Sequence, residues 1–332
     1  MRTGGVVAGL VVLLTLALVA AFSVGPLPVG LAEVFSPLRH GPAPAGAGPT
    51  APEAVFWQLR FPRVVAAGVI GAALAASGAA LQQVFRNPLA SPDLLGVSSG
   101  AALGAVIGIF LGWSLLGLQA AAFAGGLIAV ALVHVIAGAL RVRDRVLALL
   151  LTGVAVGSLL GALIAVVQML SDPVRELPAI TFWMMGSFAS VTGRDLPWLC
   201  LICAAGVAPL ALLRWRADAL ALTDDEVRTL GIGPNGLRLV LTAGATLATA
   251  SCVAAAGIVG WVGLVVPHAA RLLVGASFPR VLPVSMLLGA TLMLAIDAAG
   301  RGLATAELPP GVLSALVGAP ILFVLMLRGR RV

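Results

Sequence analysis

The stretch VVAAGVIGAALAASGAALQQV, residues 64–84, consists almost entirely of small and aliphatic residues and carries no charged side chain. A helix needs about 20 predominantly apolar residues to cross the roughly 30 Å hydrocarbon core of a bilayer. This stretch is long enough and apolar enough to do so. We therefore predict a transmembrane helix over residues 64–84.

Similar apolar runs fill most of the sequence, which is 332 residues long, 60% hydrophobic and 10% charged, with a mean hydropathy of +1.10. No soluble domain fits in what remains. The first run, of about 19 residues, exceeds the apolar core of a signal peptide, so we expect it to be retained as a span. The sequence predicts an all-α polytopic membrane protein with one transmembrane domain, residues 1–332. Runs bounded by Arg, Pro and Gly place its ten spans at about 6–24, 64–84, 94–112, 118–140, 146–169, 196–213, 238–255, 259–272, 281–297 and 310–327.

Arginines set the expected orientation of these spans. All 20 basic residues are arginine, and with both termini in the cytoplasm most of them fall on the inner face, as the positive-inside rule requires. The segment LPAITFWMMGSFASVTG, residues 177–193, is apolar enough to be an eleventh span, but counting it would reverse this bias. We expect it to be a short outer helix or a re-entrant piece.

A short polar segment, LTDDEVRTLGIGP at residues 222–234, lies between two of the apolar runs. Thr223 followed by Glu226 is a capping box, which predicts that a helix begins there. Gly231 can supply the left-handed residue that ends the helix. About two turns of helix are too short to be stable alone, so the segment either packs on its own chain as a connecting turn or binds a cytoplasmic partner. The residues concerned are Thr223, Asp224, Asp225, Glu226, Val227, Arg228, Leu230, Gly231 and Ile232.

Glycines recur at every fourth residue of the third predicted span, at Gly96, Gly100, Gly104 and Gly108. At 3.6 residues per turn they form one stripe on a helix, and such stripes let a neighbouring helix approach closely. We expect a helix-packing face, with a glycine-lined solute path as the alternative.

Three arginines run against the inward bias, because Arg60 and Arg63 precede the second span and Arg301 follows the ninth. They could be interfacial anchors. Exposed arginines are also suited to bidentate capture of carboxylates on another protein. Asp297 and Glu307 flank Arg301, and we expect them to hold it in place.

Four further segments of the sequence are distinctive: QLRFPRVVAAGVIGAALAASGAALQQVFRNPLASPDLLGVSSGA (58–101), RTLGIGP (228–234), GWVGLVVPHAARLLVG (260–275) and DAAGRGLATAELPPGVLSALVGAPILFVLMLR (297–328). They closely resemble the permease subunits of bacterial iron-siderophore, haem and cobalamin ABC importers, the FecCD-type family. The similarity covers nearly the whole chain, and the segments occur in the same order as in the family.

The resemblance implies a type II ABC importer permease in the bacterial inner membrane. Such a permease pairs with a second permease copy, expected here to be identical, with two copies of an ABC ATPase, and with a periplasmic or surface substrate-binding protein. By resemblance, residues 223–232 are the coupling helix that contacts the ATPase, and Arg60, Arg63 and Arg301 receive the binding protein. The substrate path lies between the two copies, with a cytoplasmic gate near Arg141, Arg145 and Val146.

ATP and Mg are expected on the partner ATPase, and no cofactor or metal on this chain. The absence of lysine excludes a P-loop here, since that motif needs a lysine on the nucleotide phosphates. The dispersed arginines argue against nucleic acid, and membrane lipid is the expected surrounding. The substrate is expected to be a metal chelate, foremost a ferric siderophore, with haem, cobalamin or an oxyanion as alternatives. An ion-coupled carrier would usually show intramembrane charges, and a membrane metalloenzyme would show a His-carboxylate cluster.

Overall fold

The computed structural model describes residues 3–25, 51–140, 145–303 and 307–329, and these residues form helices and connecting turns without a strand among them. The expected all-α fold is therefore confirmed. The main helices are α1 (Thr3–Ser23), α5 (Phe61–Val84), α6 (Val97–Phe110), α7 (Leu115–Ala139), α8 (Arg145–Leu170), α10 (Leu196–Leu212), α13 (Pro234–Ala256), α14 (Val262–Val274), α15 (Phe278–Gly302) and α16 (Pro310–Gly329). Shorter pieces are α4 (Ala51–Ala54), the π-helix η1 (Val55–Arg60), the 3-10 helix η2 (Pro92–Leu95), α9 (Glu176–Met184), α11 (Arg214–Asp218), the 3-10 helix η3 (Ala219–Ala221) and α12 (Asp224–Thr229).

A helix occupies each of the ten ranges in which a span is expected. In the described chain, six helices are long and apolar enough to cross a membrane, and α10 joins them if it is counted with the bent continuation that follows it. The helices α6, α14 and α16 are apolar but shorter. The ambiguous segment 177–193 contains only α9, nine residues long, which cannot cross a bilayer at 1.5 Å per residue.

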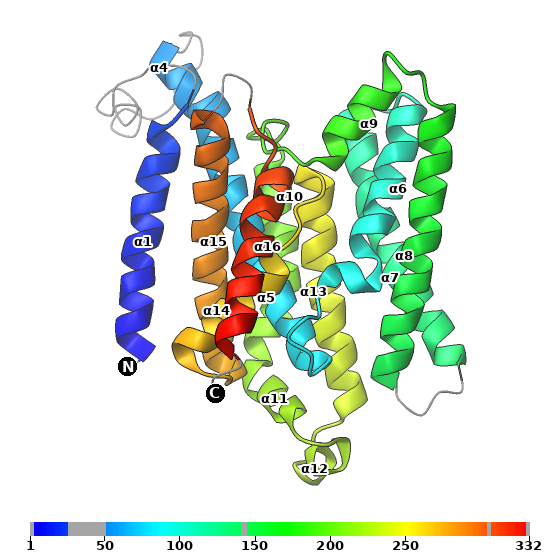
Figure 1. The fold of residues 1–332 in the computed structure, drawn as a ribbon, viewed down its shortest axis with the longest axis vertical. Coiled ribbons are helices and arrows are strands. Elements are labelled where there is room, and N and C mark those ends of the chain that lie inside the picture. The colour runs from blue at the N-terminus through cyan, green and yellow to red at the C-terminus, as the bar shows by residue number, and fades with distance from the viewer. Residues whose placement is uncertain (1–2, 26–50, 141–144, 304–306, 330–332) are drawn as a thin grey trace.

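The bundle has two distinct ends (Figure 1). The helix α1 begins and α16 finishes at the end that carries α11 and α12, whereas α4 and α9 lie at the opposite end. We refer to these as the α12 end and the α4 end. The two termini of the described bundle therefore lie on the same side as the short polar helix.

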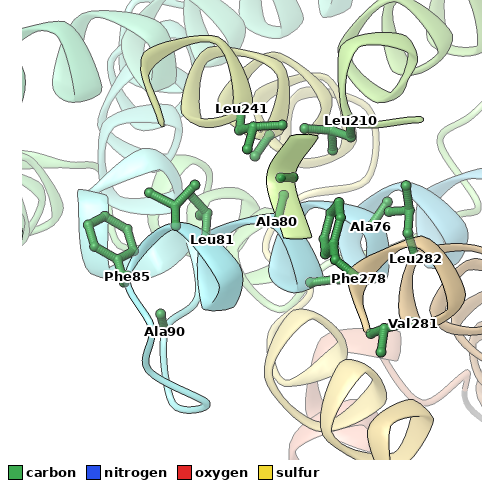
Figure 2. Packing of buried hydrophobic residues seen from close by; sticks show 14 of the residues in the cluster. Ala76, Ala80, Leu81, Phe85, Ala90, Leu210, Leu241, Phe278, Val281 and Leu282 are labelled. Atoms are coloured by element: carbon green, nitrogen blue, oxygen red, sulfur yellow. The ribbon is translucent and has the colours of Figure 1, made fainter. Parts of the chain in front are cut away.

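The helix α5 lies at the centre of the bundle. Most of its residues are buried, and α15, α13, α14 and α10 pack around it. At the α12 end, its alanines interleave with larger side chains from these neighbours (Figure 2): Ala76, Ala80 and Leu81 lie near Leu210, Leu241, Phe278 and Leu282. Small residues on α5 thus allow several helices to pack closely around it.

Two glycines of α5 allow its neighbours to approach closely. A Cβ on Gly71 would lie 2.2 Å from the carbonyl oxygen of Gly289 on α15, and a Cβ on Gly78 would lie 1.8 Å from that of Gly263 on α14. Real side-chain carbons do not approach a carbonyl so closely. These crossings therefore require glycine, the arrangement typical of tight helix packing in membranes.

The glycine stripe of the third predicted span divides in the structure. Gly100 and Gly104 lie against the backbone of Gly125 and Ala121 on α7, and Gly108 also faces α7. Gly96 lies outside the helix: its φ of 76° makes it the left-handed residue between η2 and α6. The difference arises because the span begins with a separate 3-10 turn, which the apolar run hides.

Gly78→Ala should destabilise the protein by about 1–3 kcal/mol or more, because α5 and α14 must separate to admit the methyl group. The measurement is the thermal unfolding midpoint of the protein purified in detergent. Gly68→Ala is the matched control, since it lies on the same helix and its added Cβ would meet nothing within 4 Å. Equal midpoints for the two variants would contradict this view of the α5–α14 crossing.

Candidate functional sites at the two ends of the bundle

The short helix α12 begins with the expected capping box. The Thr223 side chain accepts a hydrogen bond from the Glu226 amide at 3.5 Å, and the Glu226 carboxylate accepts one from the Thr223 amide at 2.8 Å. Asp225 and Arg228 form an exposed ion pair one turn apart. Gly231 follows with a φ of 74° and ends the helix.

Asp224 fastens α12 to two long helices. Its carboxylate accepts two hydrogen bonds from Arg238 at the start of α13, at 2.8 and 2.6 Å, and one from Arg86 just after α5, at 3.1 Å. Arg86 also donates to the carbonyl oxygen of Leu220 at 2.6 Å, and its own φ of 49° is left-handed. The hydrogen bonds and positive charge of Arg238, with that of Arg86, lower the pKa of Asp224 to about 2.

The sequence gives no sign of the role of Arg86, which lies 138 residues before Asp224. Arg238 is visible in the sequence only as a flanking positive charge. A left-handed arginine is the structural clue, because non-glycine residues adopt positive φ when their surroundings hold them there.

The two apolar side chains Val227 and Leu230 of α12 differ in exposure. Val227 is fully buried against its own chain. Leu230 is 59% exposed, and Asp225 and Arg228 are exposed beside it, while Ile232 is half-buried. The helix therefore packs on its own chain through Val227 and presents Leu230 to the surroundings.

At the α4 end, Arg60, Arg63 and Arg301 lie close together but are buried, contrary to the expected exposure. Arg63 donates from Nε to Asp297 at 2.8 Å and from Nη1 to both oxygens of Glu307, at 3.0 and 2.8 Å. Arg301 donates to the other oxygen of Asp297 at 3.1 Å. This pairing explains the burial, since an arginine is buried in a protein interior only where carboxylate or carbonyl oxygens accept the hydrogen bonds of its guanidinium group.

The same arginines also hold the end of α1. Arg60 donates to the carbonyl oxygen of Phe22 at 2.6 Å, and Arg301 donates to that of Ala21 at 2.7 Å and to that of Val24. These carbonyls lie at the end of α1, where the helix has no further backbone amide to donate a hydrogen bond to them. The arginine cluster therefore joins α1, α5 and α15.

A cavity of about 300 Å³ opens beside this cluster. Arg60, Arg63, Arg301 and Glu307 line it together with residues of η1 and of the segment that follows α9. We call it the arginine cavity. Three guanidinium groups and an accessible pocket are a suitable receptor for a carboxylate.

The predicted gate lies largely beyond what the structure describes. Arg141 falls outside the described residues, α8 begins at Arg145, and Val146 is half-buried in its first turn. Within the described ranges there is no group of three His, Cys, Asp or Glu residues that could hold a metal ion. The two ends of the bundle are thus the sites that the geometry defines.

Comparison with known proteins identifies the family of the chain. Residues 13–328 match the FecCD transport family. The chain belongs to that family. Among its relatives, the molybdate import system permease protein MolB of Haemophilus influenzae is 37% identical, over 97% of this chain and 95% of the relative. The Fe(3+) dicitrate transport system permease protein FecC of Escherichia coli is 36% identical, over 98% and 96% respectively.

A solved structure of a metal-chelate type ABC transporter in an inward-facing conformation is similar to this FecCD-family chain, with a TM-score of 0.86 and 35% identity. The similarity covers 98% of this chain and 99% of that one. The chain is therefore a membrane-spanning ABC importer permease of the FecCD family, as the sequence motifs indicate. The relatives differ in what their names say they import.

Asp224→Asn should loosen α12 in this FecCD-family permease, because it removes the charge that two arginines share. The measurement is amide hydrogen exchange over residues 224–232, which should be faster in the variant. Asp225→Asn is the matched control, since that side chain is 93% exposed and pairs with its neighbour Arg228. Identical exchange in the two variants would show that Asp224 does not hold the helix.

The same carboxylate predicts a pH dependence. Because its folded-state pKa, about 2, lies below the ordinary value of 3.8, it contributes stability that is complete above about pH 4 and lost as the pH falls through 2. The protection of α12 amides, corrected for intrinsic exchange, should fall over this window in the natural protein. The Asp224→Asn variant should lack that component.

Proposed function

We propose that two identical copies of this permease assemble with two copies of a separate ABC ATPase and receive a metal chelate from a substrate-binding protein. ATP and Mg would bind to the ATPase and not to this chain. The observation that carries the proposal is α12, a capped helix that is fixed to α5 and α13 through Asp224 and leaves Leu230 exposed. A helix of this kind can transmit the movement of a partner to the spans.

The proposed orientation places the α12 end in the cytoplasm and the α4 end outside, in a bacterial inner membrane. The shared position of α12 and both ends of the described bundle supports this assignment (Figure 1), as does the arginine bias of the sequence. The arginine cavity then faces the binding protein. An acidic side chain of that protein would enter it, as charge complementarity favours.

Within the family, the substrate is proposed to be a ferric chelate, with a ferric siderophore as the first candidate. The support is the similarity to the Fe(3+) dicitrate permease and to the metal-chelate type transporter. The similarity to the molybdate permease keeps an oxyanion as an alternative, and haem and cobalamin are further alternatives. The binding protein decides between them, because it selects the substrate before the permease receives it.

Purification of the tagged chain from its native membrane tests the proposed assembly. An ABC ATPase should be recovered with it, and the complex should hydrolyse ATP. The companion binding protein should then bind one of the ferric siderophores, haem, cobalamin and molybdate. Solute movement by the chain alone, without nucleotide, would overturn the proposal in favour of an ion-coupled carrier.

Leu230→Asp should reduce ATP-driven transport at least about tenfold, because it places a charge in the contact with the ATPase, and loss of a central interface residue costs 2 kcal/mol or more. Uptake and ATP hydrolysis would be measured in proteoliposomes that hold the whole complex. Asn235→Asp is the matched control, since Asn235 is also exposed at the start of α13 and the change adds the same charge. Full coupling in Leu230→Asp would remove the proposed role of α12.

A further inference from the structure

Two cavities at the α4 end meet at one ion pair. The arginine cavity lies on one side. A second cavity, of about 390 Å³, lies on the other and is lined by Phe182 and Trp183 of α9, by Gly257 after α13 and by Pro309 and Pro310 at the start of α16, among others. Arg63 and Glu307 are the residues that line both. Their contact therefore forms the partition between the two cavities.

The two carboxylates on Arg63 are held very differently. The Asp297 side chain is completely buried and is also bound by Arg301, so it cannot leave without stranding two positive charges. The Glu307 side chain is 44% exposed. A carboxylate that is this exposed keeps its contact with water when its ion pair opens, whereas a buried carboxylate is left without a partner. Glu307 is therefore the carboxylate that another acidic group can replace.

Glu307 lies three positions before α16 begins. The next residue, Leu308, donates from its amide to the carbonyl oxygen of Gly300 at 3.1 Å, and the Gly311 amide donates to that of Met185 at 3.2 Å. Gly311 fits closely, because a Cβ there would lie 2.3 Å from the same Met185 oxygen. The first turn of α16 is thus held by a few backbone contacts and by the Glu307–Arg63 pair.

We propose that Glu307 is an internal substitute for a carboxylate of the docked binding protein. An acidic side chain of the partner enters the arginine cavity and accepts the hydrogen bonds of Arg63 Nη1. Glu307 leaves, and the start of α16 loses its attachment to α5. Docking of the partner would thus break the Arg63–Glu307 contact and open the partition between the two cavities. This inference rests on the proposed function of the arginine cavity.

The charge balance favours such an exchange. Among the residues that the structure describes, Arg60, Arg63 and Arg301 line the cavity together with one carboxylate, that of Glu307, so a further carboxylate is attracted to it. Removal of the internal competitor should therefore strengthen docking. It should also release α16 before the partner arrives.

The test uses Glu307→Gln in the complete transporter, reconstituted in nanodiscs, with the binding protein as the probe. Association should be tighter by about fivefold, because Glu307 no longer competes with the partner's carboxylate for Arg63. The amides of Leu308 and Gly311, which hold the start of α16, should exchange faster in this variant without the binding protein. In the natural protein they should reach that rate only when the binding protein is bound.

Glu176→Gln is the matched control, because it removes the same charge from α9 at the same end of the bundle and lies outside both cavities. Equal tightening in Glu176→Gln would show a general charge effect and would overturn the exchange. So would slow amide exchange of Leu308 and Gly311 in Glu307→Gln, or no change in their exchange on docking in the natural protein.

Arg60→Glu separates this inference from the docking proposal itself, because Arg60 lines only the arginine cavity of the two. Unchanged association in Arg60→Glu would remove docking at this cavity and the exchange with it. Weaker association in Arg60→Glu, combined with unchanged or weaker association in Glu307→Gln, would keep the docking site and overturn the exchange alone.

Discussion

Close contact between helix backbones is the constraint on which this structure depends. Lipid tails are as apolar as leucine side chains, so helices in a membrane gain little by burying apolar surface against one another and rely on close packing. Gly71 and Gly78 provide that contact on α5, and the alanines between them keep the helix narrow. Four neighbouring helices pack around it as a result.

Both candidate sites lie at the ends of this central helix. Arg60 and Arg63 lie at its beginning, where η1 runs into α5, and Arg86 follows its last turn. A short stretch of chain built on α5 therefore carries Arg60 and Arg63 of the arginine cavity and also Arg86, one of the two arginines that hold α12. A displacement of α5 along its axis would be felt at both ends. This gives the molecule a direct physical connection between its two faces.

The sequence predicts those features that depend on neighbouring residues. Apolar length locates the helices, and the spacing of Thr223 and Glu226 gives the capping box to the level of individual atoms. Of the two carboxylates that flank Arg301 and were expected to hold it, Asp297 does so, whereas the structure shows Glu307 bound to Arg63. The motifs of the FecCD family are equally local, and the family comparison agrees with them.

Features that depend on distant residues could not be predicted in this way. Arg63 and Asp297 are separated by 234 positions, so three arginines near span ends were expected to be exposed although they are buried and paired. The sequence also leaves open whether the segment around Val227 packs on its own chain or on a partner, because helical periodicity shows which residues share a face but not what that face meets. Gly96 fits the four-residue glycine spacing, but its backbone is left-handed and lies outside the helix.

The shared carboxylate of Asp224 also has a consequence for how this protein can vary. If Arg86 is lost, Asp224 still pairs with Arg238, and the reverse is also true; if Asp224 is lost, two arginines lose a partner together. Substitutions at these three positions are in direct contact and so cannot have additive effects. A charge swap between Asp224 and Arg238 would place Arg86 against a new arginine. Either arginine should therefore be substituted in evolution more readily than the aspartate. Which residue is acceptable at each of the three positions depends on the residues already present at the other two.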